Sequence, residues 1–306
     1  MKIVKDLSKF KIRNSVAAIG VFDGVHCGHQ DLIKRMIRRA KKLNRKPVVI
    51  TFFPHPVQVL NKDVDVSLLV SLDHRFQLIE KLGVETCVVI RFTKKFSLLT
   101  PETFVKKYLI DSLRVSEVFI GDDFHFGKKG AGNGCILKKI AKTFGVKVNI
   151  VRSVTHGNKR ISSSLLRKLI AQGKLEHAKK LLGRTVSILG KVIYGDRIGK
   201  HIGTPTANIN PGREILPPTG VYISRVYLRN KSFGAIANVG FRPSFKENNA
   251  INLEAHLFDF NKNIYGQEIE VLFLKKIRNE KKFKTTKLLI DQVERDKKKA
   301  LQYFSK

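Results

Sequence analysis

The stretch Gly20–Gln30 (GVFDGVHCGHQ) constrains the fold of this chain more than any other feature. Ser15–Ile19 before it (SVAAI) is short and apolar, which is typical of a buried parallel strand. Asp31–Leu43 behind it repeats apolar residues at helical spacing. The stretch is therefore predicted to be a turn from a strand into a helix. Its two glycines allow close backbone approach, and a helix start attracts an anion.

His26 and His29 add two donors to that turn that are able to carry positive charge. Spaced three residues apart, they fall on one side of the first helical turn. A lone histidine is more often satisfied or solvent-facing, but two histidines, two glycines and an aspartate at a helix start favour a phosphate site. The residues expected to contact phosphate here are Gly20, Phe22, Asp23, Gly24, His26 and His29.

Strands and helices alternate through the first 151 residues with short connections, which predicts a doubly wound parallel sheet. Strands are expected at 15–19, 46–53, 85–92, 115–120 and 146–151, and helices at 31–43, 71–82, 100–111 and 136–144. Thr100 and Pro101 are typical of a helix start.

A second anion-binding candidate is Arg160–Ile170 (RISSSLLRKLI). Ser163 or Ser164 could cap a helix and keep donors to spare, with Arg160 and Arg167 on either side. An ordinary capped surface helix would look the same. Beside the two histidines, however, this segment could be the second half of a triphosphate site.

The pattern changes after Leu182, where strand follows strand and turn residues lie between them. This spacing predicts a small antiparallel β-barrel closed by a terminal helix, Thr285–Phe304. The two expected domains are residues 1–182 and 183–306, with a linking helix at 172–182. The expected barrel strands are 185–194, 220–228, 233–239, 252–258 and 268–276.

Lys191–Asn208 in the second domain is rich in glycines and cations and ends in Pro-Thr-Ala-Asn. Such a loop can wrap phosphates, and the oxygens of Thr206 and Asn208 can ligate a hard cation such as Mg²⁺. Glu254, in an otherwise apolar strand, is a candidate general base, although alternation by itself favours an outward-facing residue. The phosphate-binding residues expected in this domain are Gly190, Gly195, Lys200, Thr206 and Asn208.

The charge is strongly basic: 59 lysines and arginines against 25 acidic residues, a net charge of +34. Either a nucleic-acid partner or polyphosphate substrates in a lysine-rich protein would explain this charge. The cations are dispersed, and there is no RNP-type aromatic signature, so we favour the second explanation. With three cysteines lacking metal spacing and no apolar run of membrane-spanning length, the sequence predicts a soluble cytoplasmic protein.

The whole chain resembles the bifunctional bacterial riboflavin kinase/FAD synthetase family. GVFDGVHCGH resembles the adenylyltransferase signature of that family, and PHP, GDDFHFG and RISSSLLR resemble its later motifs. GTPTANI, ANVGFRP, LEAHLFDF and YGQEI resemble the riboflavin kinase module. Phe53, His125 and Ser164 stand where the family more often has Glu, Arg and Thr.

The resemblance implies two reactions: riboflavin and MgATP would give FMN, and FMN with a second ATP would give FAD and pyrophosphate. It implies that His26 and His29 stabilise the ATP phosphates with Ser163, Ser164, Arg160 and Arg167. It also implies that Thr206 and Asn208 position Mg²⁺ and that Glu254 activates the ribityl hydroxyl. His55, Asp123 and Phe124 are the flavin-binding candidates.

Two alternatives stay open at this point. One is a monofunctional riboflavin kinase whose first half has decayed. The other is an RNA-associated protein with a nucleotidyltransferase-like domain.

Overall fold

The computed structural model describes residues 1–7, 12, 14–61, 67–157, 159–195, 203–241 and 251–305. The chain forms two compact units. The first contains Met1–Ser67 and Leu72–Ser163, and the second contains Leu68–Ser71 and Ser164–Lys306. The boundary between residues 182 and 183 stays a prediction about domains. Within the described residues, no helix combines the length and the apolarity needed to cross a membrane.

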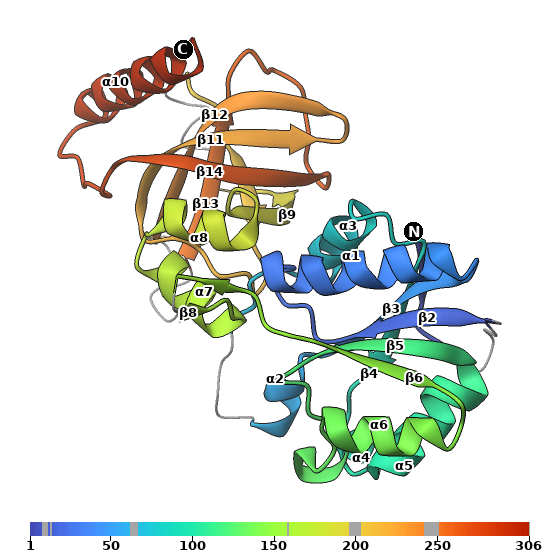
Figure 1. The fold of residues 1–306 in the computed structure, drawn as a ribbon. Coiled ribbons are helices and arrows are strands. Elements are labelled where there is room, and N and C mark those ends of the chain that lie inside the picture. The colour runs from blue at the N-terminus through green and yellow to red at the C-terminus, as the bar shows by residue number, and fades with distance from the viewer. Residues whose placement is uncertain are drawn as a thin grey trace. The chain divides into compact units, whose positions relative to one another are not determined.

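A parallel sheet of six strands forms the centre of the first unit (Figure 1), in the order β1-β4-β3-β2-β5-β6. The predicted doubly wound parallel sheet is confirmed. The edge strand β1 was not predicted because three residues are too few to show a period. The strands are β1 Lys2–Val4, β2 Ser15–Ile19, β3 Lys46–Phe53, β4 Thr86–Arg91, β5 Val115–Gly121 and β6 Lys147–Val151.

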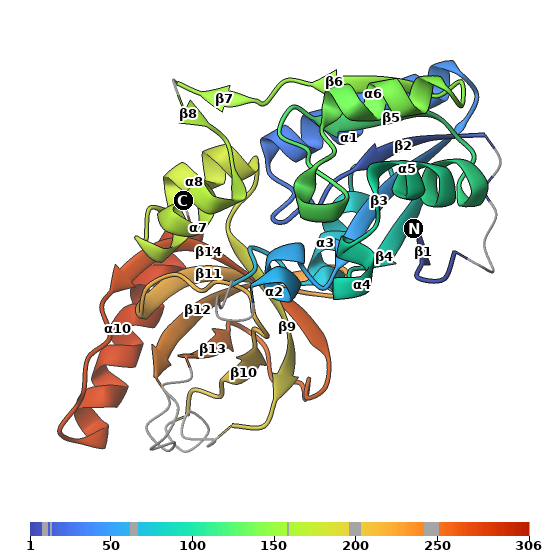
Figure 2. The ribbon, with the colours of Figure 1, turned by 90° about the horizontal axis from the view of Figure 1, so that it is seen from below.

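Helices cover both faces of this sheet, with α1 and α3 on one side and α5 and α6 on the other (Figures 1 and 2). Thr100 caps α5 as predicted, since its side chain accepts from the Thr103 N–H. The helices are α1 Cys27–Lys42, α2 Pro56–Leu60, α3 Leu72–Glu80, α4 Lys94–Ser97, α5 Pro101–Phe104 and α6 Gly134–Lys142. A π-helix at Val105–Ser112, a 3₁₀ turn at Lys128–Gly130 and a hairpin of β7 Thr155–His156 and β8 Lys159–Arg160 complete the unit.

Helix α1 begins at Cys27, four residues earlier than the predicted start at Asp31. The reason is a side-chain cap: His26 is the N-cap, and its Nδ1 accepts from the His29 N–H at 3.4 Å. Periodicity alone could not show this, because the first turn carries no apolar residue. Both histidines therefore belong to the start of the helix.

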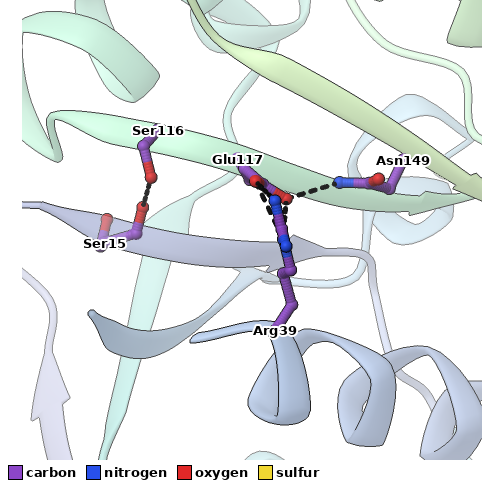
Figure 3. Close-up of polar contacts among 5 residues, drawn as sticks. All are labelled: Ser15, Arg39, Ser116, Glu117 and Asn149. Atoms are coloured by element: carbon purple, nitrogen blue, oxygen red, sulfur yellow. Dashed lines mark hydrogen bonds and ion pairs between the residues drawn. The ribbon is translucent and has the colours of Figure 1, made fainter. Parts of the chain in front are cut away.

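The other end of α1 is fixed to the sheet by a half-buried ionic network (Figure 3). Arg39 donates to both carboxylate oxygens of Glu117 on β5, at 2.5–3.0 Å, and Asn149 Nδ2 on β6 donates to the same carboxylate at 3.3 Å. The hydrogen bond from Arg39 is the largest influence on Glu117 and lowers the pKa of that carboxyl. These contacts hold α1, and with it the two histidines, against β5 and β6.

The second unit is a closed antiparallel barrel in the order β10-β13-β12-β11-β14-β9, and the predicted barrel is confirmed. Strand β10 was not predicted, because the proline and threonine before it read as a loop. The strands are β9 Ser187–Ile193, β10 Ala207–Asn210, β11 Gly220–Leu228, β12 Lys231–Phe241, β13 Ile251–Leu257 and β14 Glu268–Arg278. Helices α7 Ser163–Ala171 and α8 Leu175–Leu182 precede the barrel.

The terminal helix α10, Thr286–Phe304, packs on the outside of the barrel as predicted. Thr285 caps it by accepting from the Leu288 N–H. Ala300 of the helix lies in an apolar cluster with Val221, Ile223 and Ile236 of β11 and β12. An ion pair of 2.8 Å between Arg278 Nε and the buried Asp296 carboxylate holds the helix to the end of β14.

Candidate active site

A cavity of about 690 Å³ opens at the carboxyl ends of β2, β3 and β5. The chain moves from β2 to β3 and β4 on one side and returns to β5 on the other, so β2 is the switch point where open parallel sheets bind ligands. The predicted residues that line this cavity are Gly20, Phe22, Asp23, His29, His55, Asp123, Phe124 and Ser163. The fold thus brings together in one cavity residues that are up to 143 positions apart, Gly20 and Ser163.

The two histidines stack, with ring centroids 3.6 Å apart and an angle of 19° between the ring planes. The edge of Phe22 contacts His29 at 5.3 Å. Burial, and then the nearby His26 and Arg75, hold the pKa of His29 well below its ordinary value. His29 is therefore neutral at neutral pH in the free protein, and a bound anion would favour its protonated form.

The rest of this cavity is largely apolar and aromatic. Phe92 meets Phe52 at 6.1 Å and Phe96 at 5.3 Å, while Phe124 stacks on Phe126 at 5.5 Å. Such walls suit a flat aromatic ligand. His55 caps α2 through Nδ1 and also lines the cavity, so its structural and ligand-binding interpretations are compatible.

Arg160 pairs at 2.8 Å with Asp123, which lines the cavity, and at 3.3 Å with Asp122. Ser163 Oγ donates to the Asp23 carbonyl at 3.0 Å. Ser164 and Arg167 lie on α7 in the second compact unit, and their role in phosphate binding stays a prediction.

A second cavity, of about 340 Å³, lies on the outer face of the barrel and is lined by Thr206, Asn208 and Glu254. The strand register explains why these side chains lie together, because Glu254 on β13 is opposite Asn208 on β10 and Asn238 on β12. Side chains directly opposite on neighbouring strands lie within contact. Glu254 does face outward, as alternation indicated, but the outer face here is the wall of a cavity.

Asn252 connects Asn208 on β10 with Glu254 on β13 through two hydrogen bonds. Its Nδ2 donates to Asn208 Oδ1 at 3.1 Å and to Glu254 Oε1 at 2.8 Å. His256, on the same face of β13, hydrogen-bonds through Nδ1 to the Pro205 carbonyl at 2.8 Å, next to Thr206. Strand β13 thus holds both the Glu254 carboxylate and the segment that contains Pro205 and Thr206.

The predicted phosphate-binding glycines of this domain separate in the structure. A Cβ on Gly195 would lie 2.2 Å from Asn208 Nδ2, so Gly195 is adjacent to the site. A Cβ on Gly190 would lie 2.3 Å from the Asn210 carbonyl oxygen, so this glycine permits the approach of β10 to β9 and does not line the cavity. Lys200 lies outside the described residues.

Sequence reasoning missed several polar residues at both sites. Asn252 and His256 could have been found, because residues two positions from Glu254 share its strand face. Asn238 requires the strand register. Thr51 and Arg75, which contact the histidine-bearing turn, give no signal in the sequence, because one lies in an apolar strand and the other in an amphipathic helix.

The two candidate sites, one on a parallel α/β sheet and one on an antiparallel barrel, indicate a phosphate-transfer enzyme. The FAD synthetase family matches residues 9–165, and the riboflavin kinase family matches residues 182–304. The chain belongs to the bifunctional riboflavin kinase/FMN adenylyltransferase family. The suspected resemblance is confirmed.

Relatives match along the whole chain. The bifunctional riboflavin kinase/FMN adenylyltransferase of Buchnera aphidicola subsp. Schizaphis graminum is 39% identical, covering 100% of this chain and 99% of that protein. The enzyme of the same name from Bacillus subtilis is 38% identical, with 98% and 95% covered. The Escherichia coli K12 enzyme is 34% identical, with 99% and 98% covered.

A solved structure shares the fold. The crystal structure of a protein titled macrolide-efflux protein from Streptococcus pneumoniae is 30% identical, with a TM-score of 0.84 and 97% of each chain covered. The likeness supports the predicted combination of a parallel-sheet unit and a barrel unit.

Proposed function

We propose that this enzyme phosphorylates riboflavin to FMN with MgATP and then adenylylates FMN with a second ATP, giving FAD and pyrophosphate. The observation that carries the proposal is the convergence of Thr206, Asn208 and Glu254 in one cavity. The stacked His26–His29 pair at the other cavity supports the second reaction. Matches to both families favour two activities over a monofunctional kinase.

In the kinase reaction, Glu254 accepts the proton of the ribityl 5′-hydroxyl as its oxygen attacks the γ-phosphorus of ATP. The bond from that phosphorus to the bridging oxygen breaks, and ADP leaves. The hydrogen bond from Asn252 holds the carboxylate in place. Positioning and electrostatic stabilisation provide most of the catalysis in such transfers.

Thr206 and Asn208 fit a magnesium ion that arrives with ATP. Both offer neutral oxygens, and Asn252 donates to Asn208 Oδ1 and so fixes its orientation. Within the described part of the chain, no cluster of three His, Cys, Asp or Glu side chains could hold a metal. When bound, Mg²⁺ would neutralise phosphate charge, and the neutral donors imply weak affinity for the ion alone.

In the adenylyl transfer, an FMN phosphate oxygen attacks the α-phosphorus of ATP, and pyrophosphate leaves. His26 and His29 would stabilise the charge that builds on the phosphates, with Arg160 and Ser163 at the edge of the cavity. The aromatic wall, with His55, Asp123 and Phe124, would receive the isoalloxazine ring. Gly20, Asp23 and Gly24 belong to the turn that faces the phosphates.

We place the enzyme in the cytoplasm with ATP, riboflavin and FMN as its small-molecule partners. Among the described residues, Cys27, Cys87 and Cys135 form no disulfide, which suits a reducing compartment. The dispersed basic charge is assigned to polyphosphate substrates and not to nucleic acid.

The test is direct. The purified chain is incubated with riboflavin and MgATP, and riboflavin, FMN and FAD are resolved by chromatography over time. We expect FMN to appear first and FAD to follow. Accumulation of FMN without FAD would support the monofunctional alternative, and no conversion of riboflavin would refute the kinase assignment. Binding of mixed RNA that resists added salt would support the alternative of an RNA-associated protein.

A further inference from the structure

The backbone of the phosphate-facing turn is strained. Phe22 and Val25 have φ angles of +53° and +40°, in the left-handed region that bulky side chains rarely adopt. Gly24 between them has φ +80°. Each non-glycine residue of this kind costs about 1–3 kcal/mol and persists only where the surrounding structure over-determines it. The neighbours of this turn must therefore hold it.

The contacts that hold the turn are side-chain donors to its carbonyl oxygens. Val21 O accepts from Thr51 Oγ1 at 3.0 Å and from Arg75 Nη1 at 2.8 Å. Val25 O accepts from Gln30 Nε2 at 2.9 Å. Together with Ser163 on the Asp23 carbonyl, these donors come from three elements and the start of a fourth.

Arg75 differs from the other donors because it brings a full charge into the interior. The residue is 1% exposed, and its Nε is buried without a hydrogen-bond partner. Burial is the largest influence and lowers the pKa of Arg75, while the charge of Asp23 raises it. A guanidinium stays protonated in proteins, and removing it from water costs several kcal/mol. Packing alone would be better served by an apolar residue.

The field of Arg75 reaches His29. Its positive charge is one of the causes that lower the pKa of His29, after burial and His26. The Nδ1 atom of His29 is buried without a hydrogen-bond partner. Among the described residues, the other charged or titratable groups that line the cavity with His29 are Asp23, His55, Asp123, His125 and Lys129.

We propose that Arg75 is a positioning residue for adenylyl transfer. From beneath the turn it holds the Val21 carbonyl, and with it the left-handed Phe22, and it directs a permanent positive charge toward the bound ATP phosphates. An arriving polyanion is thus met by a charge that needs no reorganisation, in a site of low dielectric constant. The inference rests on the adenylyl transfer proposed above and adds a residue outside the recognised motifs.

Three variants of the full-length protein separate the contributions. Arg75→Gln keeps a donor for the Val21 carbonyl but removes the charge. Arg75→Lys keeps the charge but loses the planar fork of donors. Arg35→Gln is the matched control, since it removes a guanidinium from the exposed face of α1. Among the described residues, the Arg35 side chain pairs with Asp31 at 2.8 Å and does not contact the turn. FAD formation from supplied FMN, riboflavin phosphorylation, thermal unfolding and the NMR titration of His29 are measured for each variant.

We expect Arg75→Gln to lower kcat for FAD formation about 10²-fold, the loss seen when one preorganised donor to developing charge is removed. The His29 titration, assigned by its absence in His29→Ala, should move to higher pH, because a positive neighbour is gone. Arg75→Lys should lose about tenfold less than Arg75→Gln and keep the His29 titration. Arg35→Gln should stay within about threefold of wild type with an unchanged titration, because an exposed charge is screened by water.

Wild-type levels of FAD formation in folded Arg75→Gln would overturn the inference. Equal losses of FAD formation in Arg75→Gln and Arg75→Lys, with an unchanged His29 titration, would indicate that Arg75 acts only through packing. That result would also overturn the inference. Should Arg75→Gln fail to fold, Arg75→Lys decides, since a loss no larger than that of Arg35→Gln refutes a positioning role. If the wild type forms no FAD, the proposed adenylyl transfer itself has failed, and that is a separate result.

Discussion

The two candidate active sites are assembled in opposite ways. At the first, one contiguous turn supplies Asp23 and the stacked histidine pair, and the strand ends of a parallel sheet place this turn at a cavity. At the second, single residues from β10, β12 and β13 meet because the strands are in register. A motif therefore identifies the first site, whereas the second depends on correct strand pairing. Changes that act on one site and spare the other test this difference.

The largest effect is expected from Glu254→Gln in the barrel. A carboxylate that accepts a proton from an alcohol contributes about 10²–10⁴-fold, so kcat for riboflavin phosphorylation should fall by that factor. The apparent affinity for MgATP should change little, because Thr206 and Asn208 are intact. Steady-state kinetics checks this, and FAD formation from supplied FMN is the internal control. A kcat within a few-fold of wild type would remove Glu254 from the mechanism.

His29→Ala is the corresponding change in the first unit. Loss of a donor to the ATP phosphates should lower FAD formation by about 10²–10³-fold while riboflavin phosphorylation continues. Both activities are followed by chromatography in one preparation. A parallel loss of both in folded protein would contradict the existence of two independent sites.

Asn252→Ala tests the two hydrogen bonds that connect Asn208 and Glu254 in the barrel, and it should have a smaller effect. Asn252 donates to both Asn208 and Glu254, so its loss frees two side chains without removing either. We expect kinase kcat to fall about tenfold, in line with one lost hydrogen bond to a charged group. Asn252→Asp should lower it further, because it places a second carboxylate beside Glu254. An unchanged kcat in both variants would refute a positioning role for Asn252.

Glu117→Gln should change stability and leave both chemical steps intact. The pKa of Glu117 is lowered in the folded protein from its ordinary value of 4.5, so its stabilisation is present above that pH and is lost as pH falls through the folded pKa. At pH 7 the variant should lose about 2 kcal/mol of unfolding free energy, less than for a fully buried pair because Arg39 is partly exposed.

Denaturant unfolding of wild type and Glu117→Gln across pH 2–7 checks this prediction. The difference between them should shrink toward acid pH, where Glu117 is protonated in both the folded and the unfolded states. Arg35→Ala is the matched control, since the exposed Arg35–Asp31 pair, at 2.8 Å, should contribute only about 0.5 kcal/mol. A pH-independent difference between wild type and Glu117→Gln would contradict the linkage.

The sequence by itself determined the architecture and the identity of the chemistry. Apolar runs and helical spacing are local signals, and they correctly predicted a doubly wound sheet followed by a barrel. The histidine-bearing turn is also local, since His26, His29 and the glycines lie within ten residues. Motif resemblance then identified the family, which the relatives along the whole chain confirm.

Only the tertiary structure decided which distant residues complete each site. The alternation of apolar residues places Glu254 on the outer face of its strand. The strand sequence does not show that this face lines a cavity, because the cavity also depends on β10, β12 and α10. Asn238 meets Glu254 through register, which pairing across the barrel fixes. Gly190 lies against the backbone of β10, a strand that the sequence did not predict, so its close contact with Asn210 could not be foreseen. Arg75 lies fifty-four residues from the carbonyl it holds, and sequence patterns report burial and period, not long-range hydrogen bonds.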